Sequence, residues 1–564
     1  MLHLEKRSVF LWTCLVVWLA LALRYNPMMM PLFHLVSSWP ARILMVFPIL
    51  WINLLWFYAV YHTLTVITSV LSRPVLRRRL GEDACSSCPK AAILYTVCND
   101  FCAAAALSCV KQQYDNFTVF LLDDSTLADE RAKVDAFARA HDHCCVVIRR
   151  PDRRGFKAGN LNHALSGVAG GSKYFAIVDA DEVLPADFLV HTVTCCEDNP
   201  QLGFVQANHR FRSRFESRFE RDLSDGVDLH WGLSLPARNR FGFVLFYGHG
   251  ALIRTRAWRE VGGLPEMACE DIAFTTRLRE YGYHGVFLKT LIASEAFPAS
   301  YEGFLRREIR ILKGTLQFLF GSARSFLRAG NVSSVEKADM LISLGTLFLP
   351  VAFVGYLLLA NVILPLLVAH ESLAGFCGVP VGWRLFLQSL EPLGAGIEEL
   401  WTWDFYCLTV MAIGAPLVYQ IHALRRSPLR FCRYLFQSTA VFLSIIPSLF
   451  WGAVTFIMTR RVSFTATGDR ARRGAHSGNH STHLAVAFGL LFTLMSLATG
   501  NIALLTIAAS FLLHRAICRY GWENPAIRIC SFVPFIFLVV VFGAIPALSL
   551  GVIGVLASVV PAHH

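Results

Sequence analysis

The chain has 564 residues, of which 55% are hydrophobic and 16% are charged. Soluble globular domains carry about 25% charged residues, so this composition excludes an ordinary soluble protein and indicates a membrane protein. The formal net charge of +12 does not indicate nucleic acid as a partner, because the arginines cluster beside apolar runs, as they do on the cytosolic flanks of membrane segments. These clustered arginines are Arg77 to Arg79, Arg425, Arg426, Arg430, Arg433, Arg460, Arg461, Arg470, Arg472 and Arg473.

Long apolar runs occur near the N-terminus and again in the C-terminal half. They lie near 9–23, 43–70, 339–369, 405–423, 483–513 and 529–558, and each is long enough for one bilayer crossing or more. The run 483–513 is interrupted at Gly500-Asn501, which favours a tight hairpin. The loop 370–404 carries five acidic residues and one arginine, so the positive-inside rule places it outside and places residues 73–337 in the cytosol.

The uncharged run 434–458 has arginines on both flanks. A helix that crossed the membrane there would carry one basic flank to the outside, so we expect an interfacial or re-entrant helix on the cytosolic face. The predicted organisation has transmembrane helices in residues 1–72, a cytosolic domain in 73–337 with interfacial helices near 303–330, and a C-terminal membrane region in 338–564.

Strand-like and helix-like stretches alternate in residues 73–337, which predicts one α/β domain with a mostly parallel sheet. Three apolar stretches are expected strands, and each ends in polar or acidic residues. The stretches are AAILYTV, FTVFLL and YFAIV, and they are followed by Asn99-Asp100, Asp123-Asp124, and Asp179, Asp181 and Glu182. Ligands of open α/β sheets bind outside the carboxyl ends of the strands, so we expect these acids to lie together at a binding site.

Asp179 and Asp181 are separated by one residue. Their oxygens can turn toward a single hard cation, Mg²⁺ or Mn²⁺, that bridges a diphosphate and neutralises it as it leaves. A lone D-x-D is more often a solvated turn, but the companion strands favour a function here. Between the strands, Lys157 and Gly159 are expected in a loop that brings an ammonium group and the backbone close to an anionic ligand. No Walker A sequence is present, which disfavours phosphate transfer from ATP.

Glu270-Asp271 begin an expected amphipathic helix. Acids in a first turn commonly favour the helix dipole, so a capping role is the simplest explanation of the pair taken alone. The alternative is a general base that takes a proton from an attacking hydroxyl group.

Together these motifs resemble the membrane-embedded, inverting family-2 glycosyltransferases, which include cellulose synthase catalytic subunits, chitin and hyaluronan synthases and the osmoregulated periplasmic glucan synthases. The resemblance runs from Ala91 to about Gly321 and continues through residue 469. It implies a GT-A type, Rossmann-like cytosolic domain inserted in an α-helical multi-spanning membrane domain. In chain order, the motifs that carry it are LLDDST, KAGNLN, DAD, FYGHGALIR, CED, RREIRI and, in a gating loop within 459–481, FTAT.

The resemblance also implies roles for single residues. Asp123, Lys157, Gly159, Asp179, Arg307, Arg310, Phe464 and Thr467 would contact the nucleotide sugar; Asp179 and Asp181 would hold the metal; Gly248, His249 and Glu270 would contact the acceptor; and Asp271 would be the catalytic base. Glu270 should point about 100° away from Asp271 around the helix axis.

The chain departs from the family pattern at several positions. Arg307 and Ile311 replace the usual glutamine and tryptophan, so the usual stacking platform for the acceptor sugar is missing. Cys98 replaces a tyrosine that commonly packs on the nucleotide's base, and Asp469 replaces the lysine of the gating loop. Cellulose synthase itself is therefore not expected.

From the resemblance we expect an enzyme that polymerises UDP-glucose, or another UDP-sugar, into a β-glucan with Mg²⁺ or Mn²⁺. It would pass the growing glucan chain through a bacterial inner membrane, in contact with lipid and with a possible periplasmic accessory protein. An N-acetylglucosamine polymer synthase and non-processive sugar transfer to a lipid carrier remain alternatives. A transporter whose cytosolic domain senses nucleotide sugar is the alternative from another class.

Overall fold

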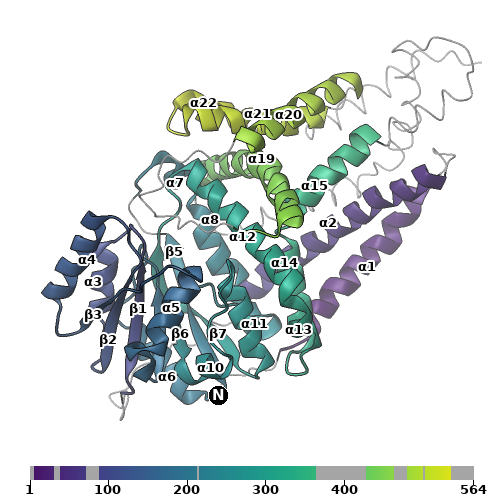
Figure 1. The fold of residues 1–564 in the computed structure, drawn as a ribbon. Helices are drawn as coiled ribbons and strands as arrows, with labels where there is room; N and C mark the ends of the chain where they lie inside the picture. Colours follow the sequence, from purple (N-terminus) through teal and green to yellow (C-terminus); the bar gives the residue numbers. More distant parts are fainter. Residues whose placement is uncertain are drawn as a thin grey trace, which may run out of the picture.

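Figure 1 shows the fold of the computed structural model. The structure describes residues 6–30, 33, 39–71, 88–211, 215–363, 427–462, 479–499 and 502–534. A mixed sheet with helices on both faces occupies the lower part of the view, and long apolar helices extend away from it at the upper right and across the top.

Within the described residues, the sheet has seven strands. They are β1 (Ala91–Val97), β2 (Phe117–Asp123), β3 (Cys145–Ile148), β4 (Tyr174–Val178), β5 (Leu202–Phe211), β6 (Ala251–Arg254) and β7 (His284–Glu295), and their spatial order is β3-β2-β1-β4-β6-β5-β7. Neighbouring strands are parallel except that β6 is antiparallel to both β4 and β5. The three strands expected from the sequence are β2, β1 and β4, which lie side by side, and the predicted mostly parallel sheet is confirmed.

The strand register brings the acidic strand ends together. Val97 of β1 pairs with Asp123 of β2, and Tyr95 of β1 pairs with Val178 of β4. The next residue after Val178 is Asp179, whose Oδ1 accepts a hydrogen bond from Thr96 Oγ1 at 3.2 Å. The predicted acidic edge of the sheet is therefore formed by the carboxyl ends of adjacent parallel strands.

Side chains on both faces of the sheet are buried, as in sheets that are covered by helices on each side. Alternate residues of β1 (Ala91, Ile93 and Tyr95) face one cluster, whereas Ala92 and Leu94 face another. The first cluster contains α3 (Ala103–Val110), α4 (Ala128–Ala140) and α6 (Phe188–Asp198). The second contains α5 (Phe156–Ser166), α10 (Thr255–Glu260) and α11 (Glu270–Glu280).

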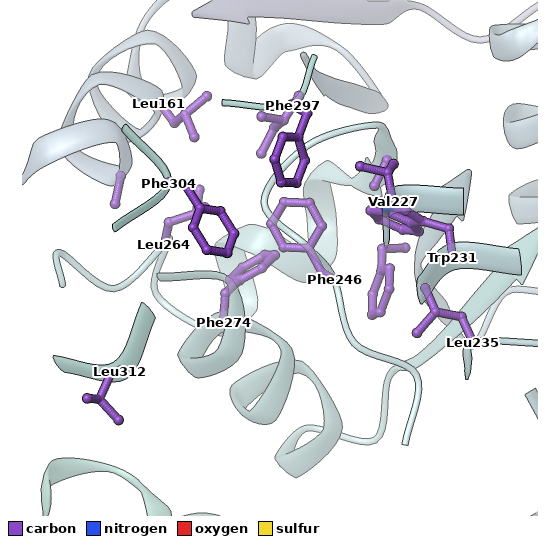
Figure 2. Packing of buried hydrophobic residues seen from close by; sticks show 14 of the residues in the cluster. Leu161, Val227, Trp231, Leu235, Phe246, Leu264, Phe274, Phe297, Phe304 and Leu312 are labelled. Carbon is purple, nitrogen blue, oxygen red and sulfur yellow. The ribbon is translucent and has the colours of Figure 1, made fainter. Parts of the chain in front are cut away.

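Short helices lie in the connections between strands. They are η2 (Val168–Gly171), α7 (Arg218–Leu223), α8 (Asp225–Leu229), the π-helical turn η3 (His230–Ser234) and α9 (Arg238–Phe241). Figure 2 shows four aromatic side chains of the buried cluster, those of Phe246, Phe274, Phe297 and Phe304, lying close together.

Further helices follow the sheet. They are α12 (Tyr301–Gly321), α13 (Ala323–Arg328), α14 (Ser334–Gly345), α15 (Leu349–Leu358), the π-helical turn η4 (Leu359–Ile363), α19 (Pro428–Thr459), α20 (Asn479–Thr499), α21 (Ile502–Tyr520) and α22 (Pro525–Cys530); α1 (Val9–Met29) and α2 (Trp39–Leu71) precede it. Leu512 of α21 lies against Gly489 of α20, so these helices pack as the hairpin predicted for 483–513.

Three helices in the described part of the chain are long and apolar enough to cross a membrane: Val9–Pro27, Arg42–Leu71 and Pro428–Thr459. Helices α14 and α15, which are bent by 56° relative to each other, would form a fourth span if the two cross the membrane as a single broken helix. Helix α19 contains the run 434–458, and its length is compatible with a crossing as well as with the interfacial position that we expect. Its position in the membrane therefore stays a prediction.

The sheet domain and the C-terminal helices share one buried core. Val441 and Ile445 of α19 and Leu513 of α21 belong to the same buried cluster as Phe304 of α12 and Leu94 of β1. Polar contacts follow the same interface, because Asp222 accepts a hydrogen bond from Trp522 Nε1 at 3.1 Å and Asp225 pairs with Arg430. In Figure 1, α19 accordingly crosses directly over α7 and α12.

Candidate active site

Asp123 ends β2 with a fully buried carboxylate. Its Oδ2 accepts a hydrogen bond from Arg149 Nε at 2.7 Å, and its Oδ1 accepts one from the backbone N–H of Ser125 at 2.9 Å. The neighbouring Asp124 accepts two hydrogen bonds from Arg150, at 2.9 and 2.7 Å. The predicted nucleotide-binding acid is thus held in place by an arginine on the segment that follows β3.

Lys157 and Gly159 do not lie in a loop, so that expectation was wrong. Gly155, at φ +71°, caps the N-terminus, and helix α5 begins at Phe156. Gly159 lies against the preceding chain, because a Cβ there would be 2.1 Å from the carbonyl oxygen of Arg154. Its N–H donates to the carbonyl of Gly155 at 2.8 Å. Gly159 therefore allows the segment before α5 to fold closely over it, and its contact with a donor stays a prediction.

Lys157 links three of the predicted site segments. From the first turn of α5 its ammonium pairs with Oδ1 of Asp179 and also donates to the carbonyl of Gly248 at 2.8 Å. Burial disfavours the charged form of Lys157, but the carboxylates around it, Asp179 first and then Glu270 and Glu182, together raise the pKa of Lys157 above its ordinary value. The lysine therefore stays protonated and joins α5, the D-x-D turn and the loop before β6.

Asp179 and Asp181 differ in their surroundings. Burial alone would raise the pKa of Asp179, but the ammonium of Lys157 lowers it below the ordinary value. Asp181 keeps exposed surface, yet the surrounding protein displaces much of its hydration and Asp179 adds a like charge. Together these effects raise the pKa of Asp181 to about 7. Two hard carboxylates that are costly to keep charged side by side are a suitable donor set for Mg²⁺ or Mn²⁺.

Below the D-x-D turn lies a buried charge network that the sequence did not indicate. Glu182 is fully buried, and its carboxylate contacts His209 Nε2 at 2.6 Å and His249 Nδ1 at 3.3 Å. It also accepts a hydrogen bond from the N–H of Asp179 at 3.3 Å. On the other side, His249 Nε2 lies 3.4 Å from Glu295, which accepts a hydrogen bond from Trp231 Nε1 at 3.0 Å.

Glu182, His209 and His249 are also the one group of three metal-ligand side chains that the described residues gather, with their donor atoms within 4.8 Å of one another. We interpret them as an ion-pair network instead. Burial disfavours the imidazolium form of His249, but the carboxylate of Glu182, together with those of Asp179 and Glu295, raises the pKa of His249 to about 10. The predicted acceptor residue His249 is therefore a fixed positive charge in the floor of the site.

Glu270 and Asp271 are the first residues of α11, as predicted. Burial raises the pKa of Asp271, and burial together with the charge of Asp271 raises the pKa of Glu270 to about 7. Asp271 is half-buried and faces Gly248, since a Cβ at Gly248 would lie 3.9 Å from Asp271 Oδ2. The hydroxyl of Thr275 donates to the carbonyl of Asp271 at 2.7 Å and accepts from the N–H of Phe246 at 3.1 Å, which ties the two segments together.

The two predicted arginines of α12 have different neighbours. The charge of Arg310 acts to lower the pKa values of both Glu270 and Asp271, so its guanidinium lies within electrostatic reach of that pair. Arg307 instead lies over the rings of Phe297 and Phe304, at 5.5 and 6.0 Å, and contacts Glu308 at 3.4 Å. Of these two arginines, Arg310 is thus the one whose charge acts on the predicted base.

The predicted gating residues Phe464, Thr467 and Asp469 lie outside the described residues. Among the described residues, Lys157, Asp179, Gly248 and His249 converge on one site, with Asp271 facing Gly248. Sequence reasoning missed Glu182, His209 and Glu295 as members of the network beneath it. The only signal for Glu182 was its place directly after the D-x-D, and His209 and Glu295 had none beyond lying in apolar strands.

Comparison with known proteins places these features in a family. Residues 174–545 match the model of "Glycosyl transferase family group 2". Among curated proteins, the chain is 27% identical over 318 residues to "Probable glucomannan 4-beta-mannosyltransferase 7" of Oryza sativa subsp. japonica, covering 55% of this chain and 54% of that protein. It is 28% identical over 196 residues to "Glucomannan 4-beta-mannosyltransferase 1" of Cyamopsis tetragonoloba, covering 34% of this chain and 37% of that protein.

A third relative is "Cellulose synthase 2" of Novacetimonas hansenii, 27% identical over 212 residues, which cover 36% of this chain and 13% of that protein. The chain thus spans about half the length of the rice relative and less of the other two. Among solved structures, "Mannosyltransferase PcManGT from Pyrobaculum calidifontis in complex with GDP-Man and Mn2+" is similar with a TM-score of 0.41 and 18% identity, covering 67% of this chain and 97% of that one.

Proposed function

Because this chain belongs to glycosyl transferase family group 2 and is therefore an inverting, GT-A type glycosyltransferase that uses a nucleotide sugar, we propose that it extends a β-linked polysaccharide. The single observation that carries the proposal is the convergence on Asp179. Lys157 joins this residue to the Gly248 loop, and the same loop faces Asp271, so a donor site and a base lie in one place.

The donor is a nucleoside diphosphate sugar, held by its phosphates. Lys157 supplies a buried ammonium on one side of the D-x-D turn, and Arg310 supplies a guanidinium that can offer several N–H groups to phosphate oxygens. Asp179 and Asp181 would hold Mg²⁺ or Mn²⁺, which when bound neutralises the charge of the leaving diphosphate. Asp123 and its partner Arg149 form the outer end of the site, at β2 and β3, where the nucleoside would lie.

Asp271 performs the proton transfer. It accepts the proton of the acceptor hydroxyl while that oxygen bonds to the anomeric carbon, and the bond from that carbon to the diphosphate breaks on the opposite face. A half-buried carboxylate with a raised pKa is a stronger base than a fully hydrated one, which supports this role. The loop at Gly248 and His249, with Glu270 behind Asp271, forms the acceptor side.

UDP-glucose is the first candidate donor, because the motifs resemble the glucan synthases. A mannosyl donor is the second, because two of the similar proteins are named glucomannan 4-beta-mannosyltransferases. The candidate spanning helices support a further part of the proposal. The enzyme lies in a bacterial inner membrane with its catalytic domain in the cytosol, and it passes the growing chain through its own helices, with an accessory protein on the far side.

The test uses the full chain, purified in detergent or lipid nanodiscs. Radiolabelled UDP-glucose, GDP-mannose and UDP-N-acetylglucosamine are supplied separately with Mg²⁺ or Mn²⁺, and the products are sized and digested with linkage-specific glucanases and mannanases. We expect one donor to give a polymer that a β-specific enzyme degrades. A single sugar on a lipid would instead support transfer to a carrier. Binding of a nucleotide sugar without release of nucleoside diphosphate would support the sensing transporter and contradict the proposal.

A further inference from the structure

A largely buried arginine lies where the sheet domain meets helices α2 and α14. Arg238 is the first residue of α9, and 13% of its side chain is exposed. Its guanidinium donates to the hydroxyl of Tyr247 at 3.2 Å and to the hydroxyl of Ser343 of α14 at 2.7 Å. Its Nε lies 3.7 Å from Oδ2 of Asp339, which is also on α14. One side chain thus joins α14 to the residue that precedes Gly248.

Asp339 is fixed in turn by α2 and by the backbone after α9. Its Oδ1 accepts a hydrogen bond from the hydroxyl of Tyr61 of α2 at 2.5 Å, and its Oδ2 accepts one from the N–H of Phe243 at 2.8 Å. A Cβ on Gly242 would lie 2.5 Å from the same carboxylate, so the backbone closes tightly over it. The carboxylate therefore has a set position relative to α2 and to the segment that leads to Gly248.

The Gly248 loop, residues 247–250, is held from two sides. Gly248 and Gly250 have left-handed backbone, with φ of +87° and +60°, and glycine gives a loop little rigidity of its own. From the sheet, Gln206 of β5 accepts from the N–H of Tyr247 at 3.1 Å and donates to the carbonyl of Gly250 at 3.1 Å. From the side of α2 and α14, Arg238 holds the loop through the hydroxyl of Tyr247.

The position of this loop matters for the proposed reaction. The carbonyl of Gly248 accepts a hydrogen bond from Lys157, and Gly248 faces Asp271. A general base must lie within hydrogen-bond reach of the hydroxyl that it deprotonates, and a small misplacement of reacting groups slows a reaction strongly. Apolar residues of similar volume often stabilise a protein as well as a buried ion pair does, so the pair of Arg238 and Asp339 is better explained by the geometry that it imposes.

We propose that Arg238 is a positioning residue for the transfer step. It aligns the Gly248 loop with α14 and α2, so that the acceptor hydroxyl meets Asp271 at a productive distance. Arg238 acts through Tyr247 and not on the reacting atoms. The inference rests on the proposed function, because it takes glycosyl transfer to an acceptor as the reaction.

The sharpest test removes one oxygen atom. Tyr247→Phe deletes the hydroxyl group that Arg238 holds and keeps the ring, and it leaves the contacts of Arg238 with α14 in place. Tyr58→Phe is the matched control, because the hydroxyl of Tyr58 donates to the carbonyl of Ile342 at 3.0 Å and ties α2 to α14 at a point outside the loop. Arg238→Lys keeps the charge and loses the planar fork of donors.

Three quantities are measured on the full chain in lipid nanodiscs, with the nucleotide sugar that the wild-type enzyme uses. They are the kcat of sugar transfer, the Kd for the corresponding nucleoside diphosphate with Mn²⁺, and the melting temperature. We expect Tyr247→Phe to lower kcat roughly tenfold, the effect of one lost hydrogen bond to a charged group, at unchanged Kd and melting temperature. Tyr58→Phe should keep the wild-type kcat.

Arg238→Lys should lower kcat as well, again at unchanged Kd. The double variant with Tyr247→Phe should lose little more than the more affected single variant, because both changes break the same contact. Fully multiplicative losses in kcat would mean that the two residues act independently and would contradict the proposal.

A wild-type kcat in Tyr247→Phe would reduce Arg238 to a purely structural role and overturn the proposal. Weaker nucleotide binding in Tyr247→Phe would also overturn it, because the loop would then act on the donor. An equal loss in Tyr58→Phe would assign the effect to the packing of α2 on α14. Should Arg238→Lys fail to fold, the comparison of Tyr247→Phe with Tyr58→Phe decides. A wild-type enzyme that forms no product from any nucleotide sugar would instead refute the proposed function itself.

Discussion

The ammonium of Lys157 pairs with Oδ1 of Asp179, so the first carboxylate of the D-x-D turn already has a cation beside it. A divalent ion at this turn would therefore share Asp179 with the ammonium of Lys157. This ammonium is held in place by a second hydrogen bond, to the carbonyl of Gly248. The lysine favours a bound diphosphate and opposes a metal ion that arrives alone. This arrangement predicts that donor and cation bind together more readily than either binds separately.

Replacing Lys157 by methionine should separate these two effects. Lys157→Met keeps the stem of the side chain and removes the charge, so we expect Mn²⁺ to bind the nucleotide-free protein roughly tenfold more tightly, while donor turnover falls at least as much. Electron paramagnetic resonance of free Mn²⁺ measures the first quantity. The control is Lys173→Met, which removes the surface ion pair between Lys173 and Glu197. Weaker Mn²⁺ binding in Lys157→Met would mean that the lysine organises Asp179 for the metal rather than competing with it.

Asp181 should be required for the use of metal. In Asp181→Asn one hard anionic ligand is lost, so turnover should fall by roughly 10²-fold or more, while the melting temperature stays near that of the wild type because the side chain is exposed. Titration of activity with Mg²⁺ and Mn²⁺ is the measurement. Near-normal rates in either metal would remove Asp181 from the metal site.

Asp271→Asn should abolish polymer formation and leave donor binding intact. The amide retains the shape of the side chain but cannot accept the proton, and general-base assistance is typically worth about 10²–10⁴ in rate. Polymer yield and nucleotide binding in the presence of metal are measured side by side, with Glu260→Gln, at the surface pair with Arg256, as the control. Loss of nucleotide binding would assign Asp271 to the donor, and full activity would make it a helix cap.

Arg310 and Arg307 should respond differently to removal. Arg310 lies within reach of Glu270 and Asp271, so Arg310→Ala should lower kcat strongly and Arg310→Lys should restore it only in part, because lysine lacks the planar fork of donors. Arg307 packs on Phe297 and Phe304, so Arg307→Ala should change the melting temperature more than kcat. Equal kinetic losses in the two alanine variants would restore the shared donor role expected from the sequence.

The buried pair of Arg279 and Glu336 should make stability depend on pH. Arg279 donates to both oxygens of Glu336, at 2.8 and 3.0 Å, and so fastens α11 to the first turn of α14. Burial alone would raise the pKa of Glu336, but the hydrogen bonds and charge of Arg279 lower it below the ordinary value. Stability from this group is therefore present above the unfolded-state pKa of about 4.3 and is lost as pH falls through the lower folded-state pKa.

The variant Glu336→Gln should cost roughly 3–5 kcal/mol near neutral pH, because it leaves a buried guanidinium unpaired. Melting temperatures of wild type and variant should converge as the pH falls below about 4. Glu197→Gln, at the partly exposed pair with Lys173, should have a small effect throughout. A constant difference between wild type and Glu336→Gln from pH 7 to pH 3 would contradict the assignment.

The acidic strand ends could be predicted from the sequence because their signal is local. An apolar run followed at once by Asp123 or Asp179 fixes both the strand and its end, and parallel pairing then brings the ends together. The position of Asp271 in the first turn of a helix could be predicted in the same way, since an acid at the start of an amphipathic stretch is typical of a helix N-terminus. The same reasoning failed at Lys157, which was expected in a loop, because Gly155 is the left-handed residue from which α5 begins.

The network under the site could not be predicted, because it is made by contacts between distant segments. Glu182 contacts His209 and His249 only after β4, β5 and β6 have paired. No spacing of these three residues in the sequence predicts the contact. The different roles of Arg307 and Arg310 were hidden for the same reason. They are three residues apart on one helix, and only the positions of Phe297 and of α11 distinguish them.

The close packing of α12 has a consequence for how this enzyme can be divided. A Cβ on Gly314 of α12 would lie 2.3 Å from the sulfur of Cys269, just before α11, and a Cβ on Gly452 of α19 would lie 3.4 Å from the side chain of Ile309 of α12. The helix is held on both sides, and the buried cluster that begins in β1 ends in α22. The catalytic domain is therefore not a detachable module. A fragment ending before α19 would present the apolar side of α12 and the ring of Phe304 to water, so soluble excision should yield an aggregating protein rather than a smaller enzyme.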